Sequence, residues 1–311
     1  MPLPFALDHI NLWLLDDGDA VVAVDSGYGI DRTRDAWMQI LAAEPRPLGR
    51  VVVTHHHPDH VGLAAWLAAR NRGQIHMTLG EYLGGQAIWH QLPGYSVVDM
   101  VAQFRAHGLA EERAAALASR GNAYRHGIPE MPTRFNRMLE GEQLRIGAHD
   151  WRVITGYGHA PEHASLYCAA LGILISGDML LPRISTNISV YAATPHDDPL
   201  GRFLDSIRGF CALPDDTLVL PSHGKPFKGI RARVEQLVEH HRDRCAALLA
   251  ECAAPRCAGE LLATLFPREL DTHQSMFAMG EAIAHLNHLE KQGELRRVVG
   301  SDELIRYVRT R

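Results

Sequence analysis

Four side chains that can bind metal ions lie within six residues of this sequence: His55, His57, Asp59 and His60. They follow the apolar run 51–53, which predicts a strand whose carboxyl end delivers them to the mouth of a sheet. Imidazole and carboxylate groups are the ligands expected for zinc and similar divalent ions. Alternation along the chain directs the four side chains toward two positions, which favours two adjacent metals over one. A chance cluster is the alternative in a chain with 19 histidines, and the close spacing disfavours it.

The motif His-x-His-x-Asp-His resembles the signature of the metallo-β-lactamase-fold hydrolases. Three later blocks resemble further blocks of that family, in the family's order: Gly-His-Ala-Pro-Glu-His at 158–163, Ser-Gly-Asp at 176–178 and Pro-Ser-His-Gly at 221–224. One block is moderately specific, whereas four in order are a strong indication. In having an aspartate at this block, Asp178, the chain resembles the glyoxalase-II-like thioesterases, the lactonases and the RNA-processing nucleases. Antibiotic-hydrolysing β-lactamases generally lack it, so we expect no useful β-lactamase activity.

The resemblance implies a four-layer αββα sandwich, with the metal site at the edge where two sheets meet; the sequence alone indicates only mixed α and β structure. Strand patterns occur at 11–15, 20–25, 50–54, 75–78, 139–146, 151–155, 166–176 and 217–220. Helical patterns occur at 32–43, 61–72, 198–212, 234–251 and 273–292. We therefore predict a catalytic domain at residues 1–233, and a linker helix with a small winged-helix-like domain at 234–311.

Strand signals vanish between about 80 and 138, where short helices are predicted at 82–90, 97–107 and 110–120. This stretch is long for a connection within a compact fold. We interpret it as a helical insertion that covers the metal cleft and shapes substrate choice. Its large apolar residues either line a pocket or only pack the insertion against its own helices: Trp89, Met100, Phe104, Tyr124, Met131 and Phe135.

Transferred by motif position, the family roles imply two metal positions that share one aspartate. The first position takes His55, His57 and His159, the second takes Asp59, His60 and His223, and Asp178 bridges both. Asp59 and Asp178 are the expected catalytic carboxylates. The implied cofactors are two divalent ions, with zinc expected and iron or manganese tolerated by similar sites. The net-positive site lowers the pKa of a shared water, so that a bridging hydroxide exists near neutral pH.

Four further residues receive roles around this site. Asp25 is expected to orient one ligand from behind, with a turn or helix cap as the alternative. His163 competes with His159 as a ligand; because the family ligand directly follows glycine, we assign His159 to the metal and His163 to a position behind it. Arg183 and Lys225 are candidates to bind a substrate carboxylate or phosphate, and a simple ion pair is the alternative for Arg183.

Composition limits the class of protein. The net charge of −5 and the pI near 6.4 give no general attraction to nucleic acid or anionic membranes. Five scattered cysteines without a Cys-x-x-Cys pair fit reduced thiols in a cytoplasm. The N-terminus does not resemble a signal peptide. The longest apolar run, near 166–175, is far shorter than the ~20 residues that span a membrane. We expect a cytoplasmic protein with no membrane association.

Residues from about 258 onward resemble the small winged-helix-like tail found on one branch of these hydrolases. Such folds often bind DNA, but the predicted helix 273–292 is nearly free of basic side chains that read a major groove. We therefore interpret the tail as a packing or dimerising element and expect a homodimer rather than nucleic-acid recognition.

The favoured function is hydrolysis of a small ester or thioester, such as an acyl-glutathione, an acyl-CoA or a lactone, by a metal-bridging hydroxide. The alternative is a phosphodiesterase or endoribonuclease that acts on single-stranded RNA. The tail favours this alternative, but the sequence has no visible basic stripe or aromatic stacking platform. A non-catalytic role with structural metals is disfavoured by the full ligand set.

Overall fold

The computed structural model describes residues 1–5 and 7–310, which form two compact units. The first unit comprises Met1–Trp89, Ala123–Thr186 and Ser206–Arg233. The second comprises His90–Asn122, Asn187–Asp205 and Val234–Arg311. Both units are therefore discontinuous in the sequence, whereas the division predicted above was linear. The central part of the predicted insertion belongs to the second unit.

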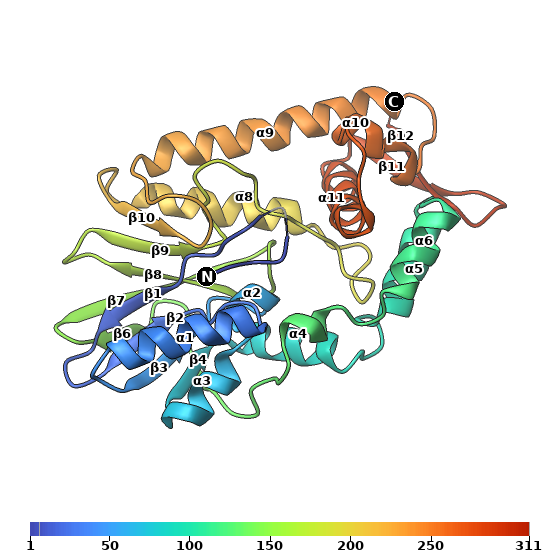
Figure 1. Cartoon of the computed structure of the whole chain (residues 1–311). Coiled ribbons are helices and arrows are strands. Elements are labelled where there is room, and N and C mark those ends of the chain that lie inside the picture. The colour runs from blue at the N-terminus through green and yellow to red at the C-terminus, as the bar shows by residue number, and fades with distance from the viewer. Residues whose placement is uncertain (6, 311) are drawn as a thin grey trace. The chain divides into compact units, whose positions relative to one another are not determined.

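Two five-stranded sheets form the frame of the first unit (Figure 1). The first sheet has the order β1 (Trp13–Asp16), β2 (Val21–Val24), β3 (Leu48–Val52), β4 (Gln74–Met77) and β5 (Asn136–Arg137). The second has the order β10 (Leu218–Pro221), β9 (Ile173–Gly177), β8 (His163–Cys168), β7 (His149–Gly156) and β6 (Gln143–Ile146). The hairpin β1–β2 is antiparallel, and β2 to β5 run parallel. In the second sheet only β10 and β9 are parallel.

The apolar run before the histidine loop lies at the end of β3, a strand that is covered on both faces. Val52 belongs to the core between the two sheets, together with Trp151 and Leu166 from the second sheet. Val51 and Val53 point the other way, into the core under the helices. A strand covered on both faces reads as a continuous hydrophobic run rather than an alternating one.

Helices cover the outer faces of both sheets. On the first sheet, α1 (Asp31–Ala43) and α3 (Ala64–Asn71) bury Trp37 and Leu67 in the helix-side core (Figure 1). On the second sheet, Ser206 in α8 (Pro199–Gly209) accepts a hydrogen bond from the Tyr157 backbone N just after β7 (2.9 Å). This arrangement confirms the predicted αββα sandwich. Helices α4 (Leu79–Trp89) and α7 (Tyr124–Gly127) also lie in the first unit.

Two predicted segments are divided in the structure. The predicted strand at 166–176 is two strands, β8 and β9, because a turn at 169–172 reverses the chain, with Gly172 at φ +61°. The predicted helix at 61–72 is two helices, α2 (Pro58–Val61) and α3, separated by Gly62 and Leu63. In the predicted insertion, Trp89, Tyr124, Met131 and Phe135 pack into the helix-side core of the first sheet.

The second unit is helical except for one two-stranded sheet. It contains α5 (Val97–Ala106), α6 (Glu111–Ser119), α10 (Leu262–Leu265), α11 (Thr272–Lys291), and the antiparallel strands β11 (Leu295–Val299) and β12 (Ile305–Arg309). Most of helix α9 (Ile230–Glu251) belongs to it, as does the short 3₁₀ turn Gly259–Leu261, whereas the 3₁₀ turn Phe210–Ala212 belongs to the first unit. Among the described residues, no helix is long and apolar enough to cross a membrane.

Helix α11 is the central helix of the second unit. Asp271 and Gln274 form a capping box at its start, and its buried residues extend around the helix from Ser275 to Leu289. Arg113 of α6 donates a hydrogen bond to the Ser275 hydroxyl (3.0 Å), so the insertion and the C-terminal segment pack together. The helix-then-hairpin order is compatible with the predicted winged-helix-like tail, which stays a prediction.

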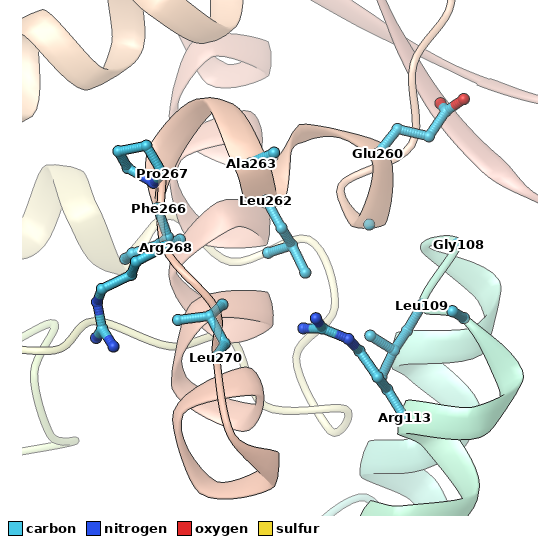
Figure 2. Close-up of a pocket in the computed structure, with 12 residues that line it drawn as sticks. Gly108, Leu109, Arg113, Glu260, Leu262, Ala263, Phe266, Pro267, Arg268 and Leu270 are labelled. Carbon is cyan, nitrogen blue, oxygen red and sulfur yellow. The ribbon is translucent and has the colours of Figure 1, made fainter.

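A pocket of about 420 Å³ lies in the second unit, between the α5–α6 turn and the segment before α11. Figure 2 shows Leu262, Leu270 and the guanidinium of Arg113 facing into it, while Glu260 points away. None of the residues in the four sequence motifs lines this pocket. The residues of all four motifs lie in the first unit.

Candidate metal centre

Three histidines from two loops meet at the carboxyl end of β3. The Nε2 atom of His55 lies 2.9 Å from Nδ1 of His57 and 3.1 Å from Nε2 of His159. Ligands at about 2.0–2.1 Å from a tetrahedral ion lie roughly 3.3 Å apart. The separations of the three nitrogens are therefore close to those that one bound ion requires.

A second group lies beside the first and combines a carboxylate with two histidines. Asp59 Oδ2 lies 3.4 Å from Nε2 of His223 and 3.7 Å from Nε2 of His60. The ligand atoms of these three residues all lie within 4.8 Å of one another. The motif residues thus form two adjacent groups.

Asp178 contacts both groups. Its Oδ2 lies 3.7 Å from Nε2 of His159 and 3.6 Å from Nε2 of His60. Its Oδ1 lies 3.5 Å from Nε2 of His223. One carboxylate therefore faces the ligand nitrogens of each group.

The hydrogen bonds of the ligand side chains show whether their free lone pairs are directed so that they could bind metal ions. His60 donates from Nδ1 to Asp25 (2.7 Å), and His223 donates from Nδ1 to the His9 carbonyl (3.0 Å). Each donation leaves an Nε2 lone pair directed at the site, the usual arrangement of metal-binding histidines. Nε2 of His60 and Oδ1 of Asp178 are buried without a hydrogen-bond partner among the described residues. A divalent ion would satisfy both atoms, so the donor set fits the expected metals.

Asp25 lies beside the second group and contacts His60. It is 2% exposed and accepts hydrogen bonds from the Thr54 backbone N (2.7 Å), the Thr54 hydroxyl (2.9 Å) and His60 Nδ1. Its backbone has φ +63°, a left-handed conformation that aspartate and asparagine adopt more readily than most residues. The side chain therefore orients His60 and ties it to the end of β3.

His163 lies outside both ligand groups. Its Nε2 accepts a hydrogen bond from the Asp178 backbone N (3.1 Å). Gly177, at φ +54°, makes this contact possible, because a Cβ there would lie 2.3 Å from Nε2 of His163. His163 therefore positions the backbone of Asp178, while His159 offers its nitrogen to the first group.

Burial and neighbouring charges act in opposite directions in this site. Burial disfavours a charge on His223, but Asp178 and Asp59 outweigh it and raise the pKa of His223 to about 10. The carboxylates likewise overcome burial to raise the pKa of His60 well above its ordinary value. Burial and the neighbouring histidines lower the pKa of His55 well below its ordinary value. The carboxylates attract positive charge, and the first group offers neutral nitrogens.

The two predicted substrate residues are less constrained. Arg183 and Lys225 are exposed, and neither forms an ion pair within the described part of the chain. The segment around Arg183 is held instead by Arg233, which donates to the carbonyls of Leu181 (2.6 Å) and Ile184 (2.9 Å). Both substrate assignments stay predictions.

The sequence patterns did not identify two residues that form hydrogen bonds to the loops of the site, Asn11 and Glu81. Asn11 donates to the carbonyls of Pro221 (3.0 Å) and Gly224 (2.7 Å), on both sides of His223. Glu81, fully buried, contacts the residue between His55 and His57. Neither Asn11 nor Glu81 stands in a motif, so only the fold brings them to the site.

A separate group of possible ligands lies in the second unit: His240, His241 and Glu281. Glu281 there forms an ion pair with Arg244 (3.0 Å). The four motifs contribute no residue to this group.

Two family models match the chain. Residues 6–223 match the metallo-beta-lactamase superfamily, and residues 245–310 match the metallo-beta-lactamase-like C-terminal domain. A crystal structure of a beta-lactamase domain protein from Burkholderia ambifaria is 45% identical, with a TM-score of 0.91, over 100% of this chain and 91% of the other. A probable metallo-hydrolase of Bacillus subtilis, YqjP, is 27% identical over 94% of this chain and 91% of the relative.

A hydroxyacylglutathione hydrolase from Cereibacter sphaeroides is 27% identical over 70% of this chain and 66% of the relative. With the sandwich and the two ligand groups in place, these matches define the class: the chain belongs to the metallo-beta-lactamase superfamily. Within that superfamily it is a metallo-hydrolase.

Proposed function

We propose that this metallo-hydrolase uses two metal ions to cleave an ester or thioester bond in a small molecule. The observation that carries the proposal is the position of Asp178. Its carboxylate oxygens lie 3.5 to 3.7 Å from ring nitrogens of both ligand groups. A carboxylate that faces both groups is the feature that two adjacent metal positions require.

In this proposal each group holds one ion. The first is held by His55, His57 and His159, the second by Asp59, His60 and His223, and Asp178 is shared. The ions we propose are Zn²⁺, with iron or manganese as alternatives, because imidazole and carboxylate ligands accept all three. Bound divalent ions supply Lewis-acid activation of water and of the scissile carbonyl.

The chain's own residues orient the ligands and limit the charge. Asp25 and the His9 carbonyl fix the rings of His60 and His223 so that Nε2 of each faces the site. Asp59 and Asp178 offset part of the positive charge of two divalent ions, and the site stays net positive. A net-positive site stabilises the oxyanion that forms when a carbonyl is attacked.

Similarity supports a thioester or ester substrate over a phosphodiester. The chain is similar to a hydroxyacylglutathione hydrolase over 70% of its length. Helix α11, the element that would read a nucleic acid in a winged-helix domain, is largely buried within its own unit. Both observations favour a small acyl substrate.

The alternative is an endoribonuclease that acts on single-stranded RNA. Arginines on the C-terminal hairpin favour it, since Arg296 and Arg309 are exposed on β11 and β12. Their neighbour Arg297 is engaged by Glu290 (2.9 Å), and Arg306 is engaged by Asp302. The free basic surface is therefore small for binding a polyanion.

A substrate comparison on metal-replete protein tests the proposal, with Asp59→Ala as the blank. The panel contains an acyl-glutathione, an acyl-CoA, a lactone and a single-stranded RNA. We expect thioester or lactone turnover that disappears in the blank. Cleavage of RNA alone would overturn the ranking, and equal turnover by the blank would overturn the assignment of Asp59.

A further inference from the structure

A second buried carboxylate lies beside the metal centre, and no motif contains it. Glu81 is in the first turn of α4, and its side chain is 0% exposed. Its Oε2 accepts hydrogen bonds from the His56 backbone N (2.9 Å) and from His56 Nδ1 (2.5 Å). Its Oε1 accepts one from the Glu162 backbone N (2.6 Å). One carboxylate thus joins the loop of His55 and His57 to the loop of His159.

The loop of His159 in turn accepts hydrogen bonds from α4 and from the residue before it. The Glu162 carboxylate accepts a hydrogen bond from the Gly80 backbone N at the start of α4 (2.7 Å). The Thr78 hydroxyl donates to the Glu162 carbonyl (2.6 Å). The loop that carries His159 is therefore fixed to the residues on both sides of Glu81. We call Glu81, His56 and Glu162 the Glu81 clamp.

Helix α4 approaches His56 closely because it contains two consecutive glycines. A Cβ on Gly85 would lie 3.2 Å from Cβ of His56 and 2.8 Å from Cε of Met131. Glycine inside a helix costs about 0.5–1 kcal/mol relative to alanine, so Gly84 and Gly85 weaken the helix in exchange for this approach. The Tyr124 hydroxyl also donates to the His56 carbonyl (2.5 Å). His56 is thus held through both its side chain and its backbone.

Burying the carboxylate is costly unless it is fully hydrogen-bonded. Burial acts to raise the pKa of Glu81, but His56 and the two backbone N–H groups outweigh it and hold that pKa below its ordinary value. A buried hydrophobic side chain would pack here without this cost. The buried charge of Glu81 is therefore explained better by the two loops that it joins than by a contribution to the stability of the fold.

The nitrogens of His55, His57 and His159 must be held close together for a metal ion to bind. Nε2 of His55 lies 2.9 Å and 3.1 Å from the ligand nitrogens of His57 and His159. To bind an ion, all three nitrogens must turn lone pairs toward one point, and this arrangement is unfavourable until the ion is bound. The pair His55–His159 joins the two loops. The clamp links those same two loops.

We infer that Glu81 is a positioning residue for the metal centre, which holds the His55–His57 loop and the His159 loop at ligand separation through His56 and Glu162. This inference rests on the proposed ligand assignment. Glu81 does not touch the substrate or the metal. It reduces the reorganisation that binding the first ion requires.

Titration of metal-free protein with Co²⁺ tests this inference, because the visible absorption of Co²⁺ reports the geometry of each site. The variant is Glu81→Gln, which keeps the shape but replaces one acceptor oxygen with an NH₂ group facing the donors of His56. The matched control is Glu130→Gln, the same change at an exposed residue of the first unit. The wild type is measured first. Failure of the wild type to bind two Co²⁺ would refute the proposed function, not the role of Glu81.

We expect Glu81→Gln to bind the first Co²⁺ 10- to 100-fold more weakly, with an altered spectrum, as changes behind metal ligands typically do. The control should match the wild type. Wild-type affinity and spectrum in Glu81→Gln would overturn the inference, even with a lower melting temperature. If Glu81→Gln does not fold, Glu81→Asp decides: it keeps the charge but is too short to reach both loops, and unaltered Co²⁺ binding there would refute the clamp.

Discussion

Asp25→Asn should release the metal from the position formed by Asp59, His60 and His223. Asparagine tolerates the left-handed backbone at φ +63°, so the change isolates the side chain. In the wild type, one oxygen of Asp25 accepts from both His60 Nδ1 (2.7 Å) and the Thr54 hydroxyl (2.9 Å). If the asparagine oxygen keeps the bond from the Thr54 backbone N, its NH₂ group faces these two donors.

The expected magnitude follows from the ring of His60. To avoid a clash of donors, His60 would accept at Nδ1 and carry its proton on Nε2, the atom that faces the metal position. The lost charge-assisted hydrogen bond is worth about 1.5–3 kcal/mol, which corresponds to roughly 10- to 150-fold weaker binding. The loss should be concentrated at the second position.

The assay is competition between metal-free protein and a coloured chelator, with stoichiometry counted for each metal. Asp19→Asn is the control, because it makes the same chemical change at an exposed residue of the β1–β2 turn. Retention of both ions by Asp25→Asn with wild-type affinity would refute the assigned role of Asp25. Equal weakening at both positions would refute the specific link to His60.

Three further outcomes are expected. Asp59→Ala should abolish turnover and leave the melting temperature of the metal-free protein nearly unchanged; near-wild-type activity would contradict a two-metal mechanism. Gly177→Ala should destabilise the fold by about 1–2 kcal/mol or more in denaturant titration, because it adds a left-handed alanine and places Cβ 2.3 Å from Nε2 of His163. Burial lowers the pKa of His285 to about 3, so below pH 6.5 the unfolded chain binds the proton and stability falls. Between pH 7 and pH 5 this residue alone should cost about 2 kcal/mol in metal-free protein, and an unchanged pH slope in His285→Asn would refute that assignment.

The motif loop could be predicted from the sequence because its ligands are local. His55, His57, Asp59 and His60 follow the end of one strand, and the structure places them in two adjacent groups of possible ligands. The position of His159 directly after glycine also separated it from His163, and His163 is in neither of the two groups of possible ligands among the described residues. Both predictions use residues that lie within a few positions of one another in the sequence.

Glu81 could not be predicted in this way. It lies 25 residues from His56 and 81 from Glu162, and no local pattern distinguishes it from a solvent-exposed glutamate on a helix. Its nearest signal is the pair Gly84–Gly85, which weakens a helix without an evident turn. Such a pair indicates close approach of another segment but does not identify that segment.

The contact of the segment 90–122 with the C-terminal segment could not be predicted either. Helices α5 and α6 were expected from the sequence, but α6 packs against α11: Arg113 and Ser275, which form one hydrogen bond, are 162 residues apart. The amphipathic pattern of a helix shows which face is buried and not which element covers it.

The discontinuous second unit sets an order of events during synthesis. The first unit can close once Arg233 has been made, but α6 cannot pack against α11 until the C-terminal segment has been made. At about 5–20 residues per second, residues 234–311 take roughly 4 to 16 s to appear. During that interval the nascent chain carries a finished metal-binding half and an uncovered pair of helices. Chaperone demand should therefore be concentrated at residues 90–122 of the second unit.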